Sequence, residues 1–144
     1  MRNDENEPKE YFERSIIVVI ICMGAGLFFD WLSLHLLMDV NPWGTAAILP
    51  GLLLTLQGLW LLVHPYAILY EDRLEIKQNF IYNKEFYYLD AKSIDEKKSG
   101  SLMMIYNDGE PEPLPMFGMK ASHKNEFRKK LAEKIALSVS KRTF

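Results

Sequence analysis

The chain has 144 residues, 49% of them hydrophobic, with a formal net charge of −2 at pH 7 and one cysteine. This length is too short for two independent globular domains plus a membrane anchor. The single cysteine, Cys22, excludes an internal disulfide and a cysteine-based zinc site.

Two long apolar stretches fill the first half of the chain, at residues 15–38 and 44–63, and only residues 39–43 separate them. Each is about as long as the roughly 20 residues that a helix needs to cross the hydrocarbon core of a bilayer. The first stretch follows an acidic tail and is followed at once by the second, so we interpret it as a retained span rather than a cleaved signal. The sequence therefore predicts a transmembrane helical hairpin over residues 15–64.

The basic residues predict the orientation of this hairpin. The connection 39–43 carries no Lys or Arg, the tail 1–14 carries three, and the remaining 14 of the 17 follow Pro65. Lys and Arg concentrate on the cytoplasmic side of membranes. We therefore expect a multi-pass protein with both termini in the cytoplasm, a cytoplasmic N-terminal tail at residues 1–14 and a cytoplasmic domain at residues 65–144.

Small residues recur on one side of each predicted span. At about 100° per residue, one face of the first helix carries Cys, Gly and Asp, and one face of the second carries Ala, Gly and Thr. Small residues let membrane helices approach closely, so we expect these faces to form the helix–helix contact. The expected contact residues are Cys22, Gly26, Asp30, Ala47, Gly51, Thr55 and Gly58.

Asp30 and Gln57 are polar residues within the predicted spans. An ionisable group in a span points to a pathway or a partner charge, so transport assisted by Asp30 is one hypothesis. The favoured alternatives are that Asp30 reaches the outer interface beside Trp31 or is protonated inside the hairpin, because the second span offers no ionisable partner. Gln57 is expected to bond to another copy or to another membrane protein, or else to snorkel or bond within the hairpin.

After His64-Pro65 the apolar pattern changes to the alternation that is typical of strands. The expected strand segments are 66–70, 74–77, 80–82 with 85–89, 93–97, 102–106 and 113–119. The run at 107–109, Asn-Asp-Gly, predicts a tight hairpin turn, because these residues tolerate positive φ. A final amphipathic helix is predicted after its N-cap, Ser122, with an apolar side formed by Phe127, Leu131 and Ile135 and extended by residues 137–139.

Aromatic residues gather between residues 80 and 88. Strand alternation would bury Phe86 and Tyr88 and expose Tyr87, or the reverse. Most of this set is expected in the core, and the remainder would leave aromatic surface for a partner.

This order of elements resembles the bacterial pleckstrin-homology-like (PH-like) domains, over residues 66 to about 138. The likeness is carried by Tyr66-Ala67-Ile68-Leu69 with Leu74-Glu75-Ile76, by Leu89-Asp90-Ala91-Lys92-Ser93-Ile94, by the strand hairpin and by the last helix. The resemblance implies an α+β fold in which a strongly bent antiparallel β-sheet, nearly a barrel, is capped by the C-terminal α-helix. It also implies a bacterial inner membrane. A simpler α+β sheet with one helix is the alternative.

The sequence carries no motif for catalysis or for a cofactor. It has no glycine-rich phosphate loop, no paired-histidine metal spacing, no nucleophile motif and no nucleic-acid-binding signature. We therefore expect a non-catalytic protein without cofactor or metal. Its expected role is that of an adaptor or an accessory or assembly subunit, whose domain binds another protein or a second copy of the chain.

The end of the chain is basic and supports an alternative function. Residues 120–144 carry eight Lys and Arg against two Glu, whereas residues 65–119 carry six basic and ten acidic residues. A basic surface beside the cytoplasmic leaflet attracts anionic lipid, and each cation contributes on the order of 1 kcal/mol. The alternative is an anionic-lipid-contacting module that uses the basic C-terminal helix. Its contacts would be Lys120, Lys124, Arg128, Lys129, Lys130 and Lys134.

Overall fold

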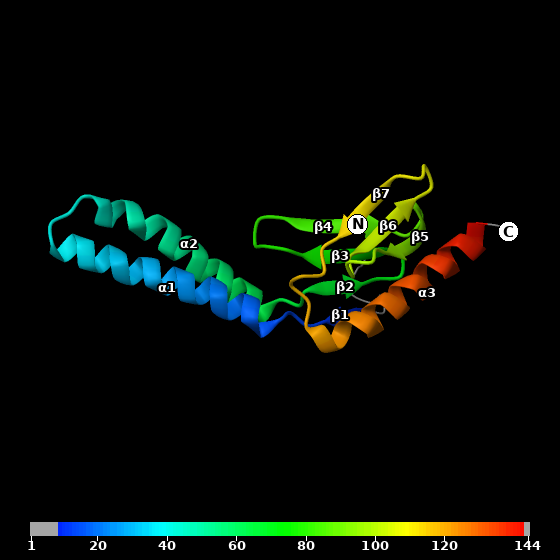
Figure 1. The fold of residues 1–144 in the computed structure, drawn as a ribbon, viewed down its shortest axis with the longest axis horizontal. Coiled ribbons are helices and arrows are strands. Elements are labelled where there is room, and N and C mark those ends of the chain that lie inside the picture. Colours follow the sequence, from blue (N-terminus) through cyan, green and yellow to red (C-terminus); the bar gives the residue numbers. More distant parts are fainter. Residues whose placement is uncertain (1–8, 143–144) are drawn as a thin grey trace, which may run out of the picture.

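The structure is a computed structural model that describes residues 9–142. The first eight residues of the predicted tail and the last two of the predicted domain lie outside this range. Two long apolar helices are followed by two antiparallel sheets and a C-terminal helix, so the predicted α+β class is confirmed (Figure 1). The helical pair extends from one end of the unit formed by the strands and the last helix, which we call the β-domain.

The helical hairpin consists of α1 (Ile16–Met38) and α2 (Trp43–Val63), both long and apolar enough to span a membrane. Their contact follows a seven-residue repeat. The repeat positions, all buried, are Val19, Gly26 and Ser33 in α1 and Gly44, Gly51 and Gly58 in α2. A repeat of seven keeps one seam of contact between helices that cross with a left-handed twist.

Strand β1 (Glu10–Phe12) was not expected from the sequence, which places these residues in the tail. It precedes the helical hairpin and pairs antiparallel with β2 (Ala67–Leu69), which follows the hairpin. Phe12 lies opposite Ala67, and both residues are buried. The hairpin is therefore inserted between two paired strands of the β-domain.

The first sheet has the order β1-β2-β3-β4, where β3 is Arg73–Lys77 and β4 is Asn83–Tyr87. Leu74 pairs with Phe86, and both are buried. Of the two alternations expected for the aromatic run, Phe86 and Tyr88 are the buried pair, and Tyr87 is exposed. The expectation that most of these aromatic residues lie in the core is wrong, because Phe80 and Tyr82 are exposed as well. The expected strand at 80–82 is wrong, because those residues form the loop between β3 and β4, where the Asn79 side chain binds the backbone.

The second sheet has the order β5-β6-β7 and contains β5 (Ala91–Glu96), β6 (Leu102–Tyr106) and β7 (Pro111–Leu114). The predicted turn at 107–109 joins β6 to β7, and Gly109 has a φ of 89° there. Strand β7 begins before the expected return strand, which was 113–119, and it ends at Leu114.

The core of the β-domain lies between the two sheets and α3 (Lys124–Arg142). The apolar stripe of α3 is buried as predicted at Phe127, Leu131 and Ile135, but its predicted extension is wrong, because Leu137 and Val139 are exposed. Ser122, the expected N-cap, lies instead in a 3₁₀ turn, η2 (Ala121–His123), that precedes α3.

Candidate functional site

The residues predicted for helix–helix contact lie largely between α1 and α2. A Cβ added to Gly26 would lie 2.6 Å from the backbone nitrogen of Thr55, and one added to Gly51 would lie 3.0 Å from that of Asp30. One added to Gly58 would lie 2.2 Å from the Met23 side chain. Small residues at these positions let the two backbones approach this closely.

Polar groups bridge the same seam. Thr55 Oγ1 donates to Asp30 Oδ2 at 3.2 Å, so Asp30 is directed at the partner helix. The Cys22 thiol donates to the carbonyl of Leu54 at 3.4 Å. Ala47 is half-buried. Sequence reasoning did not assign a bond to Ser33, whose hydroxyl donates to the Gly44 carbonyl at 2.7 Å.

Gln57 makes a contact that differs from every partner expected for it from the sequence. Its Oε1 accepts a hydrogen bond from the backbone N–H of Phe80, at 3.2 Å, in the loop between β3 and β4. The partner is therefore the β-domain of the same chain. No periodic pattern could indicate this bond, because it depends on how the β-domain is seated against the hairpin.

Charged residues fix the junction between the hairpin and the β-domain. The Arg14 guanidinium donates to the Lys77 carbonyl and lies 5.3 Å from the ring centroid of Tyr66. Burial lowers the pKa of Arg14. Lys120 binds Glu13 at 2.6 Å and lowers the pKa of that carboxyl group. Beside them lies an open cleft of about 680 Å³ between the helix ends and residues 120–121.

The basic residues predicted to contact lipid are distributed along α3 and are partly neutralised. Arg128 pairs with Glu96, and Lys130 pairs with Glu10 at 2.7 Å and with Glu126 at 3.1 Å. The structure thus divides this set: Lys120, Arg128 and Lys130 hold carboxylates, whereas Lys124, Lys129 and Lys134 form no ion pair within residues 9–142.

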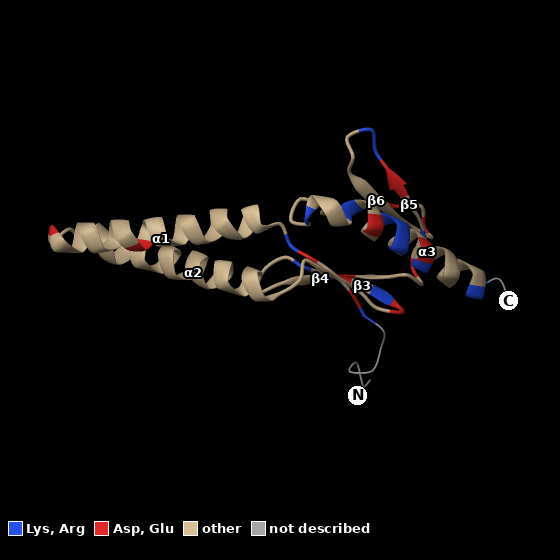
Figure 2. Cartoon of the chain, turned by 90° about the horizontal axis from the view of Figure 1, so that it is seen from below, with Lys and Arg blue, Asp and Glu red and all other residues tan. Residues whose placement is uncertain are grey.

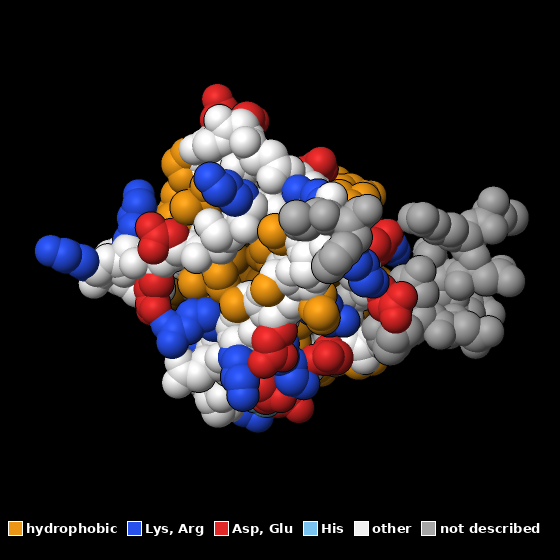
Figure 3. Space-filling view, turned by 90° about the vertical axis from the view of Figure 1, so that its right-hand side faces the viewer, with side chains coloured by type: hydrophobic (Ala, Val, Ile, Leu, Met, Phe, Trp, Pro, Cys, Tyr) orange, Lys and Arg blue, Asp and Glu red, His pale blue; other side chains and the backbone are white. Residues whose placement is uncertain are grey.

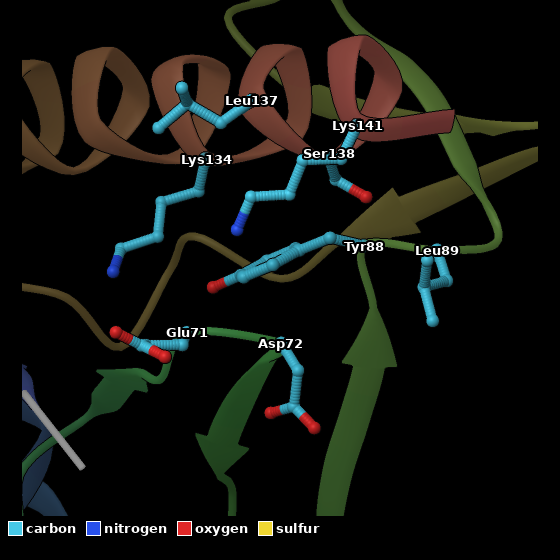
Figure 4. Close-up of a pocket in the computed structure, with 8 residues that line it drawn as sticks. All are labelled: Glu71, Asp72, Tyr88, Leu89, Lys134, Leu137, Ser138 and Lys141. Atoms are coloured by element: carbon cyan, nitrogen blue, oxygen red, sulfur yellow. The ribbon is translucent and has the colours of Figure 1, made fainter. Parts of the chain in front are cut away.

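A cavity of about 280 Å³ lies at the end of the β-domain far from the hairpin, between the second half of α3 and the turn that joins β2 to β3. Two lysines from α3 form one wall and two carboxylates from the turn form the other, with a tyrosine between them (Figure 4). The lining residues are Glu71, Asp72, Tyr88, Leu89, Lys134, Leu137, Ser138 and Lys141.

Tyr88 is the unusual group in this cavity. The residue is only 1% exposed, and its hydroxyl has no hydrogen-bond partner among residues 9–142. Figure 4 shows the hydroxyl directed into the space between the lysines and the carboxylates. Burial, and then the nearby charge of Asp72, raise the pKa of Tyr88, so the hydroxyl stays protonated and can donate to an acceptor. A buried hydroxyl without a partner costs about 1–3 kcal/mol.

The described residues contain no group of three His, Cys, Asp or Glu side chains placed to hold a metal ion. Comparison with protein-family models, with curated proteins and with solved structures finds no match to this chain. The candidate site is therefore defined by its own geometry: a small polar cavity with an unpaired tyrosine hydroxyl and two exposed leucines, Leu89 and Leu137, at its margin.

Proposed function

We propose that this chain is a small integral membrane protein of the bacterial inner membrane. It presents a cytoplasmic PH-like domain to another protein as a non-catalytic adaptor or as an accessory or assembly subunit. The hairpin is the anchor, and the face of the β-domain far from it is the docking surface.

The exposure of the two helices supports the anchor. Their most apolar segments have mean hydropathies of 2.2 and 2.0, yet only 17% of each segment is buried. A core helix of a soluble protein would be mostly buried, and so much exposed apolar surface is unfavourable in water. Neither helix carries Lys or Arg, whereas the β-domain carries many (Figure 2). The connection 39–43 between the helices carries no Lys or Arg either, and this asymmetry supports a cytoplasmic β-domain, because Lys and Arg concentrate on the cytoplasmic side of membranes.

The order of the strands supports the PH-like assignment. Four strands form one antiparallel sheet, the next three form a second, and the last helix packs on the core between them. A bent sheet closed by a C-terminal helix is what the resemblance implied. The hairpin is then an insertion after the first strand of such a domain, so a strand of the β-domain lies on each side of the anchor in the chain.

The observation that carries the adaptor role is the cavity around Tyr88. It opens at the end of the β-domain opposite the hairpin, where a cytoplasmic protein can reach it. On this face hydrophobic side chains gather among charges of both signs (Figure 3). Exposed apolar side chains around a polar group that needs an acceptor suit a protein partner.

The test is to purify the tagged full-length chain in mild detergent and to determine the mass of the recovered complex. Leu137→Glu places a charge at the margin of the cavity, and Ala132→Glu places the same charge elsewhere on the exposed surface of α3. We expect a near-stoichiometric companion with the wild type and with Ala132→Glu, and its loss with Leu137→Glu. A stable monomer without a companion would contradict the adaptor role.

The second candidate is contact with anionic lipid through the basic part of α3. The cleft at the junction favours it, because Arg14 and Lys120 lie there beside the apolar ends of both helices. Lys124 and Lys129 add two cations without ion-pair partners in the described range. The double charge reversal of Lys124 and Lys129 should reduce the anionic lipid that copurifies with the full-length protein. An unchanged lipid content would exclude this role. Residues 65–144 alone are unsuitable for the test, because they lack β1.

A further inference from the structure

The loop between β3 and β4, residues 78–82, is bonded to the side of α2. The Phe80 N–H donates to Gln57 Oε1 at 3.2 Å. Gln57 lies six residues before Val63, the last residue of α2, so the loop reaches about 9 Å along the helix from its end. Two perpendicular views show the loop beside the end of the hairpin (Figures 1 and 2).

The tip of this loop is apolar and exposed. Phe80, Ile81 and Tyr82 are 43%, 82% and 56% exposed, and residues 78–82 include no charged side chain. Phe117, in the loop after β7, is 84% exposed. It lies at the same end of the β-domain, because the next carbonyl, that of Gly118, accepts a hydrogen bond from the Ser15 N–H at 2.8 Å.

Four consecutive N–H groups of the β3–β4 loop already have acceptors. Asn79 Oδ1 accepts from the N–H groups of Ile81, at 2.9 Å, and Tyr82, at 2.6 Å. The Asn79 N–H donates to the Tyr82 carbonyl at 3.3 Å, and the Phe80 N–H is bound by Gln57. Non-helical backbone is costly in a lipid environment when its polar groups are unpaired. This loop has its N–H groups paired from residue 79 to residue 82.

We propose that Phe80, Ile81, Tyr82 and Phe117 enter the cytoplasmic interfacial layer of the bilayer, so that the β-domain is held against the membrane at a fixed tilt. This inference rests on the proposed membrane hairpin. The occupant is lipid because the loop is held beside a segment of α2 that lies inside the proposed span. Tyrosine suits this layer, since its ring is apolar and its hydroxyl can remain hydrated. The cavity around Tyr88 then faces the cytoplasm.

The test measures how deep single labelled positions lie in liposomes that contain the full-length protein. In a Cys22→Ser background, one cysteine with a spin label is introduced at Ile81, at Phe117, at Leu53 or at Leu137. Leu53 is the middle residue of α2 and is partly exposed, so it reports on the span; Leu137 is an exposed leucine on α3, far from the hairpin. Accessibility of each label to oxygen, which concentrates in lipid, is compared with its accessibility to a water-soluble nickel complex.

We expect the ratio of oxygen to nickel accessibility at Ile81 and Phe117 to exceed that at Leu137 several-fold and to approach that at Leu53. If Leu53 is in lipid but Ile81 and Phe117 are as accessible to nickel as Leu137, the loops stay in water and the inference is wrong, although the membrane hairpin stands. If Leu53 itself is accessible to nickel, the proposed membrane anchor fails as well.

Discussion

The rings of Phe12 and Phe127 meet edge to face, with centroids 5.0 Å apart and planes at 81°. Phe12 lies in the strand before the helical hairpin, and Phe127 lies in the first half of the last helix. The contact therefore joins the two ends of the described chain across the core. It ties the hairpin to the β-domain through β1 as well as through β2.

Phe127→Ala should destabilise the protein strongly. Phe127 is fully buried, and truncation of a buried phenylalanine costs about 3–5 kcal/mol. Leu137→Ala, on the exposed side of the same helix, should change the free energy of unfolding by less than about 0.5 kcal/mol. Denaturant unfolding of both full-length variants in detergent measures the free energy of unfolding. Equal losses for the two variants would contradict the position of α3 in the core.

Gly26→Ala should weaken the helical hairpin, whereas Gly24→Ala should not. The added methyl group at Gly26 would meet the Thr55 backbone at 2.6 Å, and at Gly24 nothing lies within 4 Å. Overpacking of this kind costs about 1–3 kcal/mol. The midpoint temperature of unfolding in detergent should fall for Gly26→Ala only. An equal shift for both variants would place the seam on another face of α1.

Tyr66→Phe should lower the free energy of unfolding, whereas Tyr88→Phe should not. The Tyr66 hydroxyl donates to the Pro115 carbonyl, so its removal should cost about 1 kcal/mol. The Tyr88 hydroxyl has no partner within residues 9–142, so its removal should leave the free energy of unfolding unchanged or raise it. Tyr88→Phe should also weaken partner binding. A marked loss of stability in Tyr88→Phe would show that its hydroxyl is bonded in the isolated protein.

Glu112 should make stability depend on pH in the acid range. Its hydrogen bonds from Lys84 and then Tyr106 lower its pKa below the usual value. Because the folded-state pKa is depressed, the contribution is fully present above the unfolded pKa, about 4.3, and is lost as pH falls through the folded pKa. Glu112→Gln should therefore be less stable than the wild type at neutral pH, and the difference should shrink toward pH 3.

The control for this pH effect is Glu110→Gln, because the Glu110 side chain is exposed and its carboxylate forms no ion pair within residues 9–142. Its free energy of unfolding should follow that of the wild type at every pH. A difference for Glu112→Gln that stays constant with pH would mean that the charge of this carboxylate does not contribute.

The sequence predicted the elements whose signal is local and repeated. The helices end within one residue of the expected apolar stretches, because a long apolar run has sharp ends. The buried stripe of α3 also follows from helical spacing alone. Strand β1 was missed because only Tyr11 and Phe12 are apolar in it, and its partner strand follows more than fifty residues later.

The candidate sites could not be predicted in the same way. The cavity around Tyr88 is assembled from the β2–β3 turn, the two residues that follow β4 and the second half of α3, which are distant in the chain. The bond from Phe80 to Gln57 depends on the seating of the β-domain on the hairpin. Such relationships arise from tertiary packing, and a periodic pattern in one segment does not contain them.

We propose that a membrane hairpin is inserted between two paired strands of a cytoplasmic domain. Thiol labelling of intact cells with a membrane-impermeant maleimide tests it most directly. In a Cys22→Ser background, one cysteine is placed at Val40, in the exposed connection between the helices, or at Lys98, in the exposed loop between β5 and β6. We predict that Val40→Cys is labelled in intact cells and that Lys98→Cys is labelled only after permeabilisation. Labelling of Lys98→Cys in intact cells, or of Val40→Cys only after permeabilisation, would contradict the claim.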